Sequence, residues 1–188
     1  KFPGDILGMA LNLNRSTVNA VLFGSDREIH QGDEVIGTGS VVSVPTGSSL
    51  LGRLLNAVGA PLDGKGPLVN TTARRVETNA PGIIDRESVR EPMLTGLKSV
   101  DALVPIGRGQ RELIIGDRQT GKTTIAVDAI INQRNTFKND QAALYCIYAA
   151  IGQKMSNVTQ LVRTLERRDC LKHTIVVASS SADSATLQ

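Results

Sequence analysis

The chain has 188 residues, which suits one domain, or one domain and part of another. Hydrophobic residues make up 40% of it, but aromatic residues only 3% and tryptophan none, which argues against stacking platforms for single-stranded nucleic acid. The formal net charge of +3 is modest and the basic residues are scattered, so the composition gives no reason to expect a nucleic acid partner.

The cysteines and histidines do not form a recognisable site in the sequence. Cys146 and Cys170 lie far apart and lack C-x-x-C spacing, which disfavours both a disulfide framework and a zinc site. Cys146 lies inside an apolar run and is interpreted as a buried small hydrophobic residue. No stretch approaches the ~20 apolar residues of a membrane helix, and no targeting segment is visible, although a chain that begins at Lys1 could have lost one.

Residues 1–44 are typical of short β-strands. Apolar and polar residues alternate over residues 9–14 and again over 18–22, with polar turn clusters and further valine-rich pieces at 35–36 and 41–44. Three or four strands cannot close a barrel. We therefore expect residues 1–44 to be the C-terminal part of a larger β-barrel domain, with a boundary at Pro45.

The next segment combines a helical pattern with a long connection. Apolar residues recur at helical spacing between residues 50 and 58. These residues are Leu51, Leu54, Leu55 and Val58. A glycine-rich turn follows, and residues 67–93, which are polar and contain three prolines, are expected to form an extended linker. A short helix over residues 97–104 is expected to stop before Pro105.

Residues 116–123 form the most informative stretch of the chain, because they match G-x-x-x-x-G-K-T, the phosphate-binding loop. They are Gly116, Asp117, Arg118, Gln119, Thr120, Gly121, Lys122 and Thr123. The apolar residues 113–115 before the loop predict a buried parallel strand, and residues 123–134 after it predict an apolar helix. This order of strand, loop and helix favours a nucleotide site over a chance glycine-rich turn.

Each part of the loop has a physical role. The glycines allow successive backbone N–H groups to face a phosphate, and the following helix directs its N-terminal dipole to the same anion. Lys122 would place its ammonium against the β- and γ-phosphates. Thr123 would offer its hydroxyl to Mg²⁺, and Thr124 completes the candidate nucleotide-binding set at the start of the helix.

The rest of the chain alternates strands and helices. A polar connection over residues 135–141 precedes a predicted buried strand over 142–151, with Gln153 just beyond its C-terminal end. A second helix is expected with Ser156 as N-cap, followed by a third strand over residues 174–178. The apolar face of this helix is Val158, Leu161, Val162 and Leu165. This alternation predicts an α/β fold with an open parallel sheet, whose ligand lies beyond the carboxyl ends of the strands, near the loop and Gln153.

The residues around the loop identify a family. Residues 105–113 (PIGRGQREL) and 116–123 (GDRQTGKT) closely resemble the α subunit of the rotary F-type ATP synthase, and residues 80–84 and 150–154 fit the same family. The resemblance covers nearly the whole chain, and the DRQT segment within the loop is its most specific part. The sequence departs from the family at Met155, where arginine is usual, and at serines 179–181.

The resemblance implies a RecA-like P-loop domain, incomplete and covering residues 45–188, preceded by the remaining part of a small β-barrel. In the catalytic subunits of this family a glutamate follows the second strand, whereas this chain has Gln153. A neutral amide can bind a water molecule but cannot accept its proton near neutral pH. The resemblance therefore implies a non-catalytic subunit that holds ATP (or ADP) with Mg²⁺, and the alternative is that Gln153 is an ordinary polar residue at a strand end.

The resemblance also implies partners and a place in the cell. It implies an H⁺-transporting two-sector ATP synthase, in which catalytic β subunits alternate with this subunit in a hetero-hexameric ring around a central rotor stalk, with peripheral attachment to a membrane. The longer polar connection at residues 135–141 resembles mitochondrial members of the family more than chloroplast ones, which implies the matrix side of the mitochondrial inner membrane. The alternative is the inner face of a bacterial or chloroplast membrane. Two rival functions remain open: a catalytic RecA-like hexameric motor, such as an RNA translocase or export ATPase, and a structural subunit with a vestigial loop.

Overall fold

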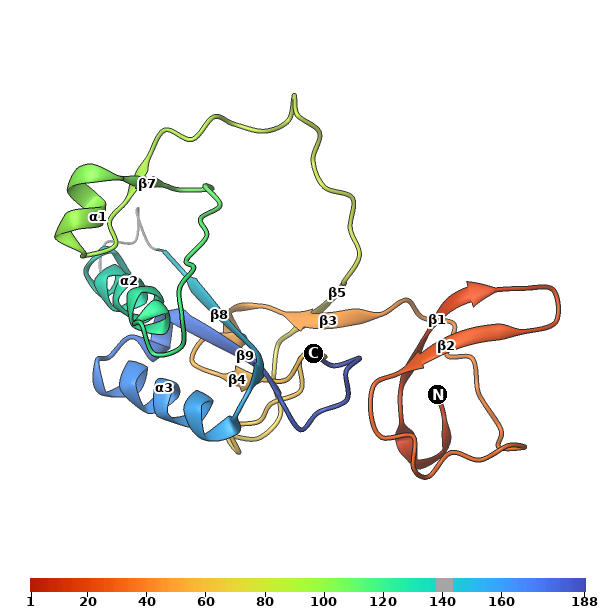
Figure 1. The fold of residues 1–188 in the computed structure, drawn as a ribbon. Helices are drawn as coiled ribbons and strands as arrows, with labels where there is room; N and C mark the ends of the chain where they lie inside the picture. Colours follow the sequence, from red (N-terminus) through yellow and green to blue (C-terminus); the bar gives the residue numbers. More distant parts are fainter. Residues whose placement is uncertain (138–143) are drawn as a thin grey trace.

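The computed structural model describes residues 1–137 and 144–188. Its centre is a three-stranded parallel sheet in the order β4–β9–β8 (Figure 1). The strands are β4 (Leu54–Leu55), β8 (Cys146–Gln153) and β9 (Thr174–Ser180). Two helices, α2 (Lys122–Phe137) and α3 (Met155–Arg167), cover one face of this sheet, so the predicted α/β arrangement with a parallel sheet is present.

The core lies between the sheet and these two helices. Helix α3 contributes three buried residues at helical spacing, Val158, Leu161 and Leu165, while the predicted fourth, Val162, is partly buried against them. They pack with Ile130 of α2 and with small residues of the sheet. Helix α3 begins two residues earlier than predicted: Lys154 occupies the N-cap position without a side-chain cap bond, and Ser156 lies inside the first turn.

Strand β8 differs from its prediction in position and in burial. It begins at Cys146 rather than at residue 142, and it ends at Gln153. Ile147 and Ile151 are 70% and 65% exposed, because they point away from the face that the helices cover. Of the predicted connection 135–141, residues 135–137 belong to α2 and the others lie outside the described residues, as do residues 142 and 143 of the predicted strand.

The two cysteines are free thiols in or beside this core. Cys170 is fully buried, whereas Cys146, predicted to be buried, is half-buried and packs against the same cluster. Burial raises the pKa of the Cys146 thiol to about 11. The thiol is therefore protonated at neutral pH and acts as a packing group, in agreement with the predicted role as a small hydrophobic residue.

The helix predicted between residues 50 and 58 is wrong. A 3₁₀ helix (Ser48–Leu50) is followed by Gly52 at φ 78°, which breaks any helix, and then by strand β4. Leu54 and Leu55 pair in parallel with Val176 and Val177 of β9, and both leucines are buried. The apolar residues at helical spacing therefore belong to a turn and a short strand, and not to one helix.

The N-terminal part contains the predicted hairpin. A 3₁₀ helix (Pro3–Asp5) precedes the antiparallel strands β1 (Gly8–Leu13) and β2 (Val18–Leu22). The valine-rich pieces at 35–36 and 41–42 form no strand; instead β3 (Ser43–Thr46) pairs with β5 (Thr72–Arg75). Pro45, the expected boundary, therefore lies inside β3, where a two-stranded sheet tolerates its missing N–H.

The predicted linker is largely irregular and exposed, and residues 76–91 sweep away from the sheet in a wide arc (Figure 1). The arc ends at β6 (Pro92–Met93), which pairs with β7 (Ile106–Gly107). Between them, α1 (Lys98–Leu103) ends before Pro105 as predicted. A further 3₁₀ helix (Leu171–His173) leads into β9. No helix in the described part of the chain is both long and apolar enough to cross a membrane.

The strand predicted directly before the phosphate loop is also wrong. Residues 113–115 are extended but unpaired, and Leu113 and Ile115 are 80% and 85% exposed. A strand needs a partner for its N–H and C=O groups, and none of the described backbone hydrogen bonds reaches this segment. Residues 113–115 therefore have the apolar composition of a strand, but no described strand lies beside them to pair with their backbone.

Candidate nucleotide-binding site

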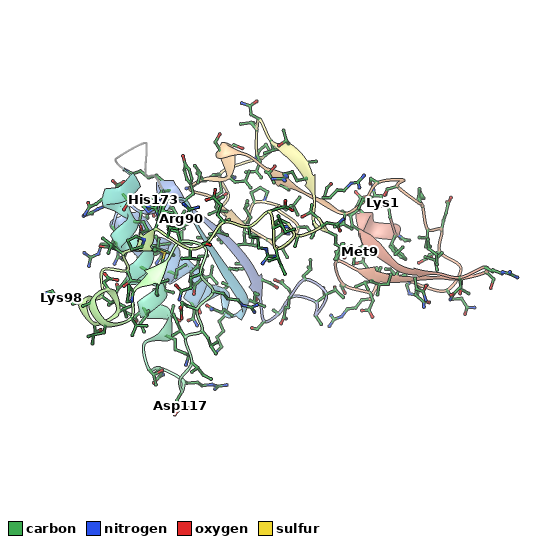
Figure 2. All side chains as sticks on the ribbon, turned by 90° about the horizontal axis from the view of Figure 1, so that it is seen from above. Lys1, Met9, Arg90, Lys98, Asp117 and His173 are labelled. Atoms are coloured by element: carbon green, nitrogen blue, oxygen red, sulfur yellow. The ribbon has the colours of Figure 1, made fainter. Side chains whose placement is uncertain are left out.

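The phosphate loop connects the unpaired segment to the first turn of α2. Its first five residues, 116–120, are exposed, while Gly121 and Lys122 are half-buried. Asp117 stands at the far tip of the loop (Figure 2). Gln119 and Gly121 adopt positive φ values of 64° and 90°, so the chain reverses sharply into the helix. A Cβ at Gly116 would lie 2.9 Å from Thr120 Oγ1, too close for any larger residue without a shift.

Hydrogen bonds hold the loop in this curve. Thr120 Oγ1 donates to the carbonyl of Asp117 at 2.8 Å. Lys122 Nζ donates to the carbonyl of Gly116 at 2.5 Å and also to the carbonyl of Asp117. The ammonium of Lys122 therefore lies over the concave side of its own loop.

The donor groups of the loop fit an anion. Among the described residues, no backbone N–H from Asp117 to Gly121 donates to another protein atom, so these donors remain available. The 16-residue helix α2 begins at Lys122 and directs the positive end of its dipole towards the loop. This combination of amides, ammonium and helix dipole suits the terminal phosphates of a nucleotide.

The remaining loop candidates lie next to these donors. Thr123 and Thr124 are exposed in the first turn of α2, and Arg118 is exposed beside Asp117. The Thr123 hydroxyl is an oxygen ligand of the kind that Mg²⁺ accepts, together with phosphate oxygens and water. Residues 116–124 thus form one exposed loop and the first turn of α2, and their role in binding a nucleotide stays a prediction.

Gln153 lies at the carboxyl end of β8. It is half-buried, stands opposite Ser180 in the parallel register, and follows an irregularity at Gly152, where φ is 65°. Its carbonyl accepts a hydrogen bond from Ser181 N at 3.1 Å. No described hydrogen bond joins Gln153 to the loop, because residues 113–115 do not enter the sheet and so do not draw the loop to its edge.

Two polar residues that the sequence did not single out lie beside Gln153. Asp183 and Gln188 close a turn directly after β9 through hydrogen bonds to Ser180. The available signal was local: a serine followed three residues later by an aspartate, which is typical of a side-chain-stabilised turn.

Comparison with known families gives two matches. Residues 96–188 match the model of the ATP synthase alpha/beta family, nucleotide-binding domain, and this range contains both the loop and Gln153. Residues 1–39 match the model of the ATP synthase alpha/beta family, beta-barrel domain. The two matches together cover more than half of the chain. With the parallel sheet, they confirm the predicted fold class: an incomplete RecA-like P-loop domain preceded by part of a small β-barrel.

Proposed function

We propose a function from one premise: the chain belongs to the ATP synthase alpha/beta family. Within that family it is part of an α-type subunit, which binds ATP or ADP with Mg²⁺ and does not hydrolyse it. The subunit stabilises the catalytic head while neighbouring subunits perform the chemistry.

One observation carries the proposal: an amide, Gln153, stands at the carboxyl end of β8. Resemblance to the family implies that catalytic members carry a glutamate there. General-base catalysis contributes about 10²–10⁴-fold to such reactions, and glutamine cannot supply it. The DRQT segment of the loop supports the same assignment, because catalytic subunits usually have small residues at these positions.

The proposed roles of the loop residues follow from their chemistry. The N–H groups of residues 117–121 bind phosphate oxygens, and Lys122 exchanges the carbonyls of Gly116 and Asp117 for the terminal phosphates. Thr123 contributes its hydroxyl to Mg²⁺, which neutralises phosphate charge when bound. The exposed Arg118 and Gln119 complete the rim of the loop.

The family also supports a proposal for assembly. The subunit alternates with catalytic β subunits in a hexameric ring around a central rotor stalk. Through the complex it associates peripherally with a membrane that maintains a proton gradient, on the matrix side of the mitochondrial inner membrane. Proton-driven rotation in this assembly supports ATP synthesis in the catalytic neighbours.

The experiment loads radiolabelled ATP into this site of the assembled complex and follows its conversion to ADP during steady-state turnover. The proposal expects the label to remain ATP through many turnovers of the neighbouring sites. Conversion at the bulk rate would favour the catalytic hexameric motor instead. Failure of the site to retain label above a Lys122→Ala control would favour the structural subunit with a vestigial loop.

A further inference from the structure

The chain after β9 folds into a turn that is held by side chains. Asp183 Oδ2 accepts the N–H of Ser180 at 2.6 Å, and Ser180 Oγ accepts the N–H of Ala182 at 3.1 Å. Gln188 Nε2 then donates to two carbonyls, those of Ser180 at 3.3 Å and Asp183 at 3.1 Å. Gln188 therefore bridges both ends of the turn.

This turn is hydrogen-bonded to the main chain of Gln153 on the neighbouring strand β8. Ser180 is the register partner of Gln153, and the N–H of Ser181 donates to the Gln153 carbonyl. On the other side, Gln188 Oε1 lies 3.4 Å from the position that a Cβ on Gly152 would occupy. The turn thus contacts both Gly152 and Gln153 at the end of β8. The register with β9 shifts here, so regular pairing between the two strands no longer fixes the backbone of these residues.

We propose that Asp183 and Gln188 are positioning residues for Gln153. They hold the turn after β9, the turn holds the main chain of Gln153 through Ser181, and the amide of Gln153 is thereby set toward the bound nucleotide. This inference rests on the proposed function, because it assumes that Gln153 faces nucleotide in the complete subunit. It adds two residues from a different strand end to the site.

Substitutions can separate the parts of this turn. Asp183→Ala removes the acceptor of the Ser180 N–H, whereas Asp183→Asn keeps an acceptor oxygen and should restore wild-type behaviour. Gln188→Glu keeps the side-chain size but replaces the donor group with an acceptor facing two carbonyls. Ser184→Ala is the matched control, since Ser184 lies in the same turn region and bonds to Thr186 instead.

The test measures release of radiolabelled ATP from the assembled complex after dilution into unlabelled ATP. Asp183→Ala removes a hydrogen bond to a carboxylate, and Gln188→Glu removes two hydrogen bonds donated by an amide. Each should therefore accelerate release at least about five-fold, while Asp183→Asn and Ser184→Ala should not. Repeating both variants with Gln153→Ala distinguishes positioning from general stability: their effects should disappear when the side chain they position is absent.

Two results would overturn the proposal. Effects that persist undiminished with Gln153→Ala would show that the turn acts independently of Gln153. An unchanged release rate in the single variant Gln153→Ala would show that the Gln153 side chain does not help to retain ATP, so its position would not matter. If the Asp183→Ala variant fails to assemble, the comparison of Gln188→Glu with and without Gln153→Ala still tests the proposal. Failure of the unsubstituted complex to retain ATP would instead contradict the proposed function itself.

Discussion

Lys122 donates a hydrogen bond through Nζ to the carbonyl oxygen of Gly116 at 2.5 Å, joining the last part of the phosphate loop to its first residue. The ammonium therefore already lies inside the curve of the loop. A phosphate offers a charged acceptor in place of a neutral carbonyl, and hydrogen bonds between charged groups are the stronger kind. If the loop binds a nucleotide as proposed, the Lys122 ammonium exchanges these carbonyl acceptors for phosphate oxygens.

Lys122→Ala should weaken nucleotide binding by about 1.5–3 kcal/mol, the range for hydrogen bonds to charged groups. Titration calorimetry of the complete subunit with Mg·ATP measures this difference. Lys98→Ala, which removes an exposed lysine at the start of α1, is the control for a change in net charge. Equal ATP affinity of the two variants would count against the assigned loop.

A second prediction concerns the ion pair of Arg53 and Asp63. Arg53 Nε lies 2.6 Å from Asp63 Oδ2, both side chains are largely buried, and the backbone N–H of Leu54 also donates to this carboxylate. The Arg53 hydrogen bond lowers the pKa of Asp63 from 3.8 to about 2. A lowered pKa in the folded state means that the pair stabilises the fold above pH ~4 and loses this contribution as pH falls towards 2.

The contribution of Asp63 is of the order of 2 kcal/mol above pH ~4. Asp63→Asn removes the charge, so the complete subunit should lose stability at pH 6 relative to wild type, and the gap should narrow as pH falls from 5 to 3. Unfolding midpoints in denaturant across this range measure the gap. A gap that stays constant with pH would show that the carboxylate charge does not matter.

A third prediction concerns the core under α3. Leu165 is fully buried among residues of α2, α3 and the sheet, so Leu165→Ala should destabilise the complete subunit by about 2–5 kcal/mol through lost contacts and a cavity. Leu103→Ala, at a position that is 80% exposed, is the control and should change stability by less than about 0.5 kcal/mol. Similar losses in both variants would contradict the position of the core.

The sequence correctly predicted those elements whose signal lies within one continuous stretch of residues. The helices α2 and α3 and the strand β9 all agree with the structure. Helix α3 has a clear apolar face, whereas α2 and β9 were predicted from apolar stretches within their own residues. The leucines at 54 and 55 misled the prediction, since two buried neighbours fit a short strand as well as a helical turn. Only the pairing partner β9, which lies far along the chain, decides between them.

The candidate site shows the same division. The loop residues could be predicted as a site because their motif is local, and Thr120 and Lys122 form hydrogen bonds within the loop. Their contact with a nucleotide stays a prediction. Residues 113–115 were given a strand from composition alone, but a strand also requires a neighbour, and the described sheet provides none for them. Asp183 was missed as a turn residue because its bond to Ser180 matters only once β9 places Ser180 beside Gln153.

The last prediction concerns Gln153→Glu, which installs the base that a non-catalytic site, as proposed here, would lack. Proton acceptance alone is worth about 10²–10⁴-fold, but an arginine finger is worth about 10³–10⁵-fold and water positioning is needed as well. Groups that act as a unit give little when only one is restored. We therefore expect radiolabelled ATP held by the Gln153→Glu site to remain ATP during turnover of the neighbouring sites, and we expect the same of the Gln153→Ala site. Acid quenching at intervals and counting labelled ADP measures the conversion. Hydrolysis at the bulk rate in the glutamate variant, with none in the alanine variant, would show that the missing carboxylate alone keeps this site inactive.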